Sequence, residues 1–219
     1  VSGIIGGLYS STATISVLAR KSRKASEQEA TDYVAAMLLA ISMMFLRFMI
    51  LILIFSREIF LSIYPYLLTM AVVAAIVAWF IHSRQKRSND QPVEAEEDDS
   101  SNPLEFKVAL IFAVLFVVFT FLTHYTLVYA GTGGLNLLSF VSGFSDITPF
   151  ILNLLQNTGS VAALIITACS MQAIISNIMV NMFYALFFAG KGSKLRPWIL
   201  GGFGVVIACN LVLLLFFYI

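Results

Sequence analysis

The sequence predicts an all-α polytopic membrane protein, a bundle of about seven transmembrane helices. Apolar residues make up 59% of the 219-residue chain and charged residues 11%, against about 45–50% and 25% in soluble domains. The apolar residues also form runs of about 20, the length at which a helix crosses a bilayer. The formal net charge is only +1, so no basic field would attract nucleic acid, and the expected partner is the lipid bilayer.

Seven stretches are long and apolar enough to be expected as spanning helices. They cover residues 3–19, 33–55, 60–81, 106–129, 135–155, 161–188 and 197–218. The connections are short except at 82–105, where Lys and Arg give way to Glu and Asp in a composition that cannot bury enough surface to fold. The chain therefore divides into a first membrane repeat at 1–81 lacking its first helix, a charged solvated linker at 82–105, and a second membrane repeat at 106–219.

Matching polar blocks indicate that the two halves are an internal repeat. Residues 7–15 align with residues 143–151 and share Gly, Thr and Ile, and in both halves an Ala-Ala pair and two apolar runs follow. With a further helix before Val1, each repeat would hold four helices. An even number of helices per repeat predicts two parallel repeats, related by an axis along the membrane normal.

The basic loops give a conflicting indication of orientation. Lys and Arg mark loops that stay in the cytoplasm, and both residues 20–24 and the start of the linker are basic. The third basic loop, at 191–196, falls on the opposite side if all seven spans cross. Either the orientation is not fixed by these charges, or one of the spans is re-entrant.

Arg47 and Asp146 are the charged residues at membrane depth. Arg47 is eight residues from the nearer end of its span, about 12 Å along a helix, and Asp146 is at the middle of its span. Each would cost about 2.5–3.5 kcal/mol facing lipid, so both should face the bundle interior or water. They either neutralise each other as a structural pair, or Asp146 is a cation or proton site that Arg47 tunes.

The residues around Asp146 predict a helix that stops and restarts inside the membrane. Gly143 permits a break, Asp146 is a good N-cap, and Pro149 is tolerated only in the first turn of a helix. Hydroxyl residues follow a Gly pair at the matching place in the first half, and paired breaks of this kind indicate a transporter site. The candidate ion- or substrate-binding residues are Ser10, Ser11, Thr12, Arg47, Asp146, Thr148, Asn177 and Asn181.

Nothing in the sequence favours an enzyme. An intramembrane aspartyl protease needs two carboxylates that share a proton, and only one lies at depth here. No HExxH motif is present, and both histidines are near span ends. We expect no cofactor, and the residue pattern does not identify a bound metal.

Several blocks resemble a bacterial membrane domain of unknown function that is usually fused C-terminal to an MgtC/SapB-type domain. They are residues 6–14 with the basic boundary that follows, residues 44–47, residues 102–106 and residues 143–146, in the same order. Family members often carry an acidic residue near Thr148 and a basic one near Asn181, where this chain differs. The resemblance implies a multi-pass protein of the bacterial inner membrane, with an N-terminal MgtC-type domain or a second copy of the chain as possible partners.

These features together favour a small-ion transporter, for a cation or coupled to protons, or an accessory of such a transporter. The bound species would then be a small inorganic ion held by hydroxyl and carboxylate oxygens, which hard cations prefer. The alternative is a regulatory membrane protein that transports nothing and acts through membrane partners. A flux that saturates and depends on Asp146 would separate the two.

Overall fold

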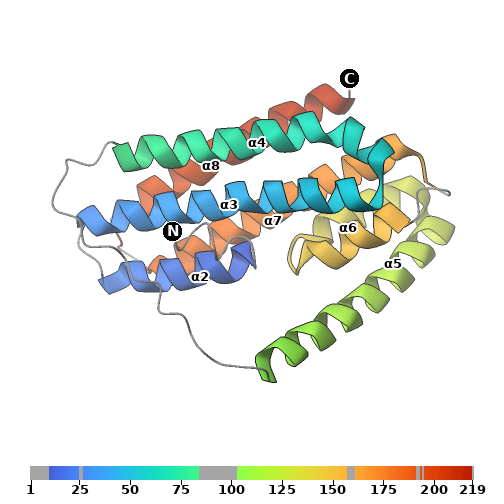
Figure 1. Cartoon of the computed structure of the whole chain (residues 1–219), viewed down its shortest axis with the longest axis horizontal. Coiled ribbons are helices and arrows are strands. Elements are labelled where there is room, and N and C mark those ends of the chain that lie inside the picture. Colours follow the sequence, from blue (N-terminus) through green and yellow to red (C-terminus); the bar gives the residue numbers. More distant parts are fainter. Residues whose placement is uncertain are drawn as a thin grey trace.

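The computed structural model describes residues 10–24, 27–83, 103–156, 161–190, 193 and 195–218. All regular structure in these ranges is helical, which confirms the predicted all-α membrane bundle (Figure 1). The helices are α2 (Ser11–Lys21), the short 3-10 helix η1 (Ser22–Lys24), α3 (Glu27–Phe55), α4 (Arg57–Ser83), α5 (Pro103–Ser142), α6 (Ile147–Gln156), α7 (Ala163–Ala189) and α8 (Arg196–Tyr218).

Five of the described helices are long and apolar enough to cross a membrane, namely α3, α4, α5, α7 and α8. In contrast, α2 has 11 residues and α6 has 10, which is about 15–16 Å of helix against a hydrocarbon core of about 30 Å. The expectation of about seven spans is therefore corrected for the described residues. They form five long helices and two half-length helices.

The predicted span at 135–155 is wrong. Its first residues continue α5, which kinks at Gly131 (φ 59°) and ends at Ser142, and its last residues form α6. Gly131 lies in the predicted connection between two spans, and its left-handed φ favours glycine. After the kink, Asn136 and Cys169 contact each other, as do Phe140 and Ser176, so this part of α5 runs parallel to α7.

The long helix α7 shows the direction of both half-helices. Helix α2 begins at the level of Asn177 and ends near the end of α7, where Arg23 donates a hydrogen bond to the Phe187 carbonyl. Helix α2 therefore runs parallel to α7. Helix α6 also begins at the level of Asn177, but its last residue, Gln156, is followed within a few residues by the start of α7 at Ala163. Helix α6 therefore runs antiparallel to α7.

The two halves are consequently inverted, and the prediction of parallel repeats is wrong. Figure 1 shows α2, α3 and α4 each running opposite to its counterpart α6, α7 or α8. The error came from counting 135–155 as one crossing. Because the chain enters with the end of α5 and leaves with α6 on the same side, one crossing is lost and an inverted arrangement results.

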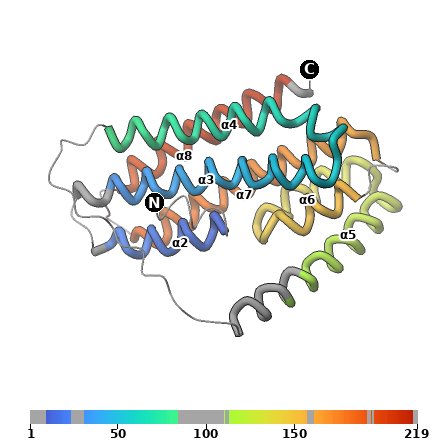
Figure 2. The backbone as a smooth tube through the Cα atoms, viewed as in Figure 1, coloured from blue at the N-terminus to red at the C-terminus, as the bar shows by residue number. Residues whose placement is uncertain are grey.

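The end of α5 and helix α6 together form a re-entrant hairpin, which enters and leaves on the same side of the bundle. This hairpin also explains why the basic loops gave conflicting indications of membrane orientation. Arg23, at the end of α2, contacts both Phe187 and Gly190 at the end of α7. Arg196 begins α8 at this same end of the bundle, and α4 ends there at Ser83, just before the basic start of the linker (Figure 2). The described basic residues of these segments therefore lie on one side.

Helix α7 is the central helix and α5 is peripheral. In the most apolar stretch of each, 67% of α7 is buried inside the protein, but only 11% of α5. The exposed apolar residues of α5 suit contact with lipid. The polar groups carried by α7, by contrast, lie away from lipid and can form an internal site.

Candidate functional site

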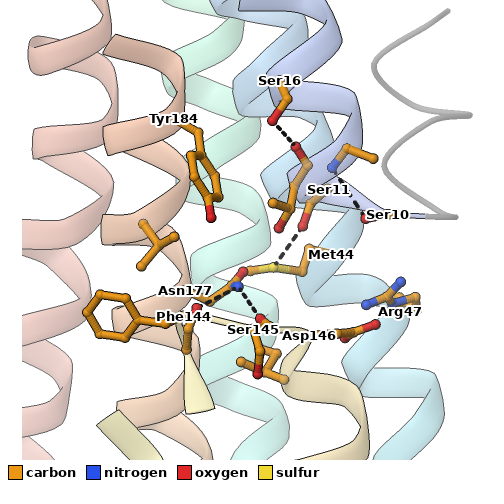
Figure 3. A pocket seen from close by; sticks show the side chains of 15 residues that line it. Ser10, Ser11, Ser16, Met44, Arg47, Phe144, Ser145, Asp146, Asn177 and Tyr184 are labelled. Atoms are coloured by element: carbon orange, nitrogen blue, oxygen red, sulfur yellow. Dashed lines mark hydrogen bonds between the residues drawn. The ribbon is translucent and has the colours of Figure 1, made fainter. Parts of the chain in front are cut away.

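A cavity of about 380 Å³ lies where the two half-helices begin. Its walls come from the first turns of α2, the middle of α3, the break between α5 and α6, and the middle of α7 (Figure 3). The lining residues are Ser10, Ser11, Thr12, Ala13, Ser16, Met44, Arg47, Gly143, Phe144, Ser145, Asp146, Ile147, Asn177, Val180 and Tyr184.

Ser10 starts α2 at the cavity wall, as its residue type predicts. Its backbone is extended (φ −155°, ψ 111°), and its hydroxyl accepts a hydrogen bond from the Ala13 amide at 3.3 Å. The next hydroxyl, on Ser11, is buried and donates to the Met44 sulfur of α3 at 3.4 Å. The first turn of α2, from Ser10 to Ala13, therefore lines the cavity.

Asp146 starts α6 in the same manner, with a carboxylate in place of a hydroxyl. The carboxylate accepts a hydrogen bond from the Thr148 amide at 2.9 Å. Pro149 is the third residue of α6, within the first turn, where its missing amide proton costs no helical hydrogen bond. The predicted N-cap and the predicted restart of the helix are both confirmed.

Gly143 is required by close packing. It is not among the glycines with positive φ in the described chain. A Cβ at Gly143 would collide with the Ser176 side chain and lie 2.7 Å from the Asn177 backbone nitrogen. Glycine therefore lets the break pack directly on the backbone of α7, as small residues do at helix contacts in membranes.

Asn177 holds the break in place. Its side-chain amide donates to the carbonyls of Gly143, at 3.1 Å, and Ser145, at 3.5 Å. Asn181 donates to the Asn177 side-chain oxygen at 3.1 Å, one turn further along α7. Two carbonyls that the break would otherwise present to a bound cation are thus already hydrogen-bonded.

Arg47 reaches the cavity from α3, as expected for a charge at membrane depth. Its guanidinium donates to the Thr148 hydroxyl at 3.1 Å and lies 5.2 Å from the centre of the Phe48 ring. Arg47 and Asp146 lie next to each other at one side of the cavity (Figure 3). The cation therefore sits at the beginning of α6, beside the anion that caps it.

The electrostatics of the cavity favour negative charge in a ligand. Each helix N-terminus carries roughly half a positive charge, and the N-termini of α2 and α6 both face the cavity. Arg47 adds a full positive charge, while Asp146 is the single carboxylate among the lining residues. The helix N-termini and the guanidinium suit an anionic group, and Asp146 is the opposing charge beside them.

Six of the eight predicted residues line the cavity. They are Ser10, Ser11, Thr12, Arg47, Asp146 and Asn177. Thr148 and Asn181 are not lining residues, but each is hydrogen-bonded to one, Thr148 to Arg47 and Asn181 to Asn177.

Sequence reasoning missed the α3 and α7 residues that complete the wall. Tyr184 points toward the cavity from α7, seven residues after Asn177, and Val180 lies between them on the same helix (Figure 3). That spacing puts Tyr184 on the face already marked by Asn177 and Asn181. Met44, three residues before Arg47, could have been found by the same argument. Ser16 is not among the predicted residues, but it lines the cavity and donates to the Thr12 carbonyl at 2.9 Å.

The comparisons with known proteins establish a family but no activity. An uncharacterized protein of Aquifex aeolicus (strain VF5) is 24% identical over 216 residues, which is 98% of this chain and 92% of that protein. No solved structure matches. The model of the family described as Domain of unknown function (DUF4010) matches residues 1–189, so the chain belongs to this family.

Proposed function

We propose that the protein is a transporter that binds a small solute with an anionic group where its two half-helices begin, and that couples its movement to protons. The observation that carries the proposal is the cavity between two inverted N-termini. In transporters with inverted repeats, interrupted helices place such N-termini against anionic groups of the substrate near the midplane. The length of α2 and α6, about half a bilayer each, supports that depth.

The choice of an anionic group departs from the cation favoured by sequence alone. A bare cation needs several oxygen ligands, and the Gly143 and Ser145 carbonyls each already accept one hydrogen bond from Asn177. Arg47 and the two N-termini repel a cation as well. A carboxylate or an inorganic oxyanion would instead accept hydrogen bonds from the guanidinium and from the first-turn amides that do not donate to the Ser10 and Asp146 caps.

Asp146 is the proposed proton site. It is not buried by the rest of the chain, lines the cavity and lies beside Arg47. Protonation of its carboxylate would remove the negative charge nearest to a bound anion and so favour binding. Deprotonation would weaken binding and favour release, which links the solute gradient to the proton gradient.

The proposed location is the bacterial inner membrane, which the protein would cross several times. The positive-inside rule assigns the basic end of the bundle, with Arg20, Lys21 and Arg23, to the cytoplasm. In this orientation α2 fills the cytoplasmic half of the bundle and α6 the opposite half. Rocking of one repeat against the other would open the cavity to each side in turn. A second copy of the chain or an N-terminal MgtC-type domain is a proposed partner.

Proteoliposomes test the proposal directly. The purified protein would be assayed with a panel of inorganic oxyanions and small carboxylates under an imposed pH gradient, with rubidium and magnesium as the cation arm. Saturable anion uptake that collapses with a protonophore is expected for the wild type and for Ser42→Ala, because Ser42 is not a lining residue of the cavity and donates to the Ala71 carbonyl between α3 and α4. Uptake should fail for Arg47→Gln. Uptake of cations alone, or no uptake together with a stoichiometric membrane partner, would contradict the proposal.

A further inference from the structure

Buried polar residues continue along α7 beyond the cavity, toward its N-terminus. Thr167, Ser170, Asn177, Asn181 and Tyr184 recur at intervals of three, four and seven residues, which places them on one face of the helix. Asn177 and Tyr184 line the cavity. Thr167 and Ser170 lie two to three turns further, in the half of the bundle that α6 occupies.

The hydroxyls of Thr167 and Ser170 stand out from the other helical hydroxyls. Both residues are 0% exposed, and neither hydroxyl has a hydrogen-bond partner in the described part of the chain. In membrane helices such hydroxyls commonly donate to the carbonyl four residues earlier. Those that do so here are Thr14, Ser16, Thr69, Thr120 and Ser139.

Within the described ranges the hydroxyls of Thr167 and Ser170 therefore make no hydrogen bond to the backbone of their own helix or to a neighbouring helix. Buried polar groups in proteins are nearly always hydrogen-bonded to protein or water. Two such groups on the face that carries the cavity indicate a region that becomes hydrated in another state of the protein. A helix used only for packing would hold apolar or back-bonded residues at these places.

From this arrangement we infer that the α7 face carrying Thr167 and Ser170 is the solute route between the cavity and the side of the membrane opposite the basic end. The route takes water and a small anion, whose oxygens accept hydrogen bonds from the two hydroxyls in passing. This inference rests on the proposed transport function. It adds a second polar site, two to three turns of α7 from Asn177.

Cysteine accessibility tests the route without any need for flux. Native Cys169 and Cys209 would first be changed to Ala in the full chain, and Ser170→Cys and Thr167→Cys introduced separately. Each variant in liposomes would be treated with 2-sulfonatoethyl methanethiosulfonate, a small anionic thiol reagent. The matched control is Ile175→Cys, because Ile175 is 4% exposed and lies five residues from Ser170, about 140° around the helix from it.

Labelling of Ser170→Cys and Thr167→Cys at least ten times faster than of Ile175→Cys is the expected result. Equal rates for the three cysteines, or no labelling at positions 167 and 170 in folded, monodisperse protein, would overturn the route. The two variants act as substitutes if one fails to fold. Labelling with no anion uptake would contradict transport but keep the hydrated path, whereas uptake with unreactive cysteines would contradict the path alone.

Discussion

The first turns of α2 and α6 are both capped at the cavity, but by different chemical groups. Both start a half-length helix at the cavity, and both are capped by a side-chain oxygen. The cap of α2 is the neutral hydroxyl of Ser10, whereas the cap of α6 is the carboxylate of Asp146. Arg47 reaches the α6 side through Thr148. The titratable chemistry of the site is thus concentrated at one of two otherwise similar helix ends.

The largest effect is expected at the charged end. Asp146→Asn keeps the size of the cap and its ability to accept from the Thr148 amide, but removes the proton site. Proton-driven anion uptake should fall at least tenfold, about 1.4 kcal/mol, while the variant still elutes as folded protein. Ser10→Asn at the neutral end is the matched change and should leave uptake within about twofold, since Asn caps as well as Ser.

A double variant separates coupling from simple charge neutralisation. If Asp146 serves only to balance Arg47, then Asp146→Asn combined with Arg47→Gln should regain both stability and uptake. If Asp146 carries the coupled proton and Arg47 binds the anion, the double variant should remain as inactive as Arg47→Gln alone, which is the result we expect. Thermal unfolding in detergent and uptake in liposomes would be measured on the same preparations. Restored uptake in the double variant would contradict the proposed role of Asp146 as the proton site.

Gly143 tests whether the start of α6 depends on its close contact with α7. Gly143→Ala should destabilise the fold by about 1–3 kcal/mol through overpacking, since its Cβ would strike Ser176. Gly204→Ala in α8 is the control, because nothing lies within 4 Å of its added Cβ. That change should be neutral or slightly stabilising. Equal melting temperatures for the two variants would show that the break does not depend on this contact.

The sequence predicts where the helices of the site begin, because residue types favour or exclude a helix start, but it does not predict the direction in which they run. Ser10 and Asp146 are strong N-cap types, and Pro149 limits where a helix can begin, so the start of α2 and the restart at α6 were both visible in the sequence. The direction of α6 was not, because hydropathy over residues 135–155 is the same for a crossing and for a hairpin. The three basic segments allowed one re-entrant element as an alternative to an unfixed orientation, but they did not say which element it would be. Tyr184 and Met44 were missed because they are apolar-compatible residues on long helices, although their helical spacing from Asn177 and Arg47 places them on the faces that line the cavity.

The smallest effect is expected at the neutral end. Ser10→Ala removes the hydrogen bond to the Ala13 amide and should cost about 1 kcal/mol of stability, with uptake reduced only as far as α2 frays. Ser42→Ala, which loses one bond to the Ala71 carbonyl, should cost a similar amount and leave uptake unchanged. Thermal unfolding and uptake, compared for the two variants, would show whether α2 matters to the site. A Ser10→Ala variant as inactive as Asp146→Asn would mean that the two ends are functionally equal.

Anion binding between the two half-helices would be tested most decisively by an experimental structure of the protein in lipid nanodiscs with the best-transported anion. We expect one anion within hydrogen-bonding distance of the Arg47 guanidinium, between the first turns of α2 and α6. Its density should disappear in Arg47→Gln prepared in the same way. An anion bound elsewhere, or a cation held by Asp146 with Arg47 turned out of the cavity, would contradict the proposed binding site.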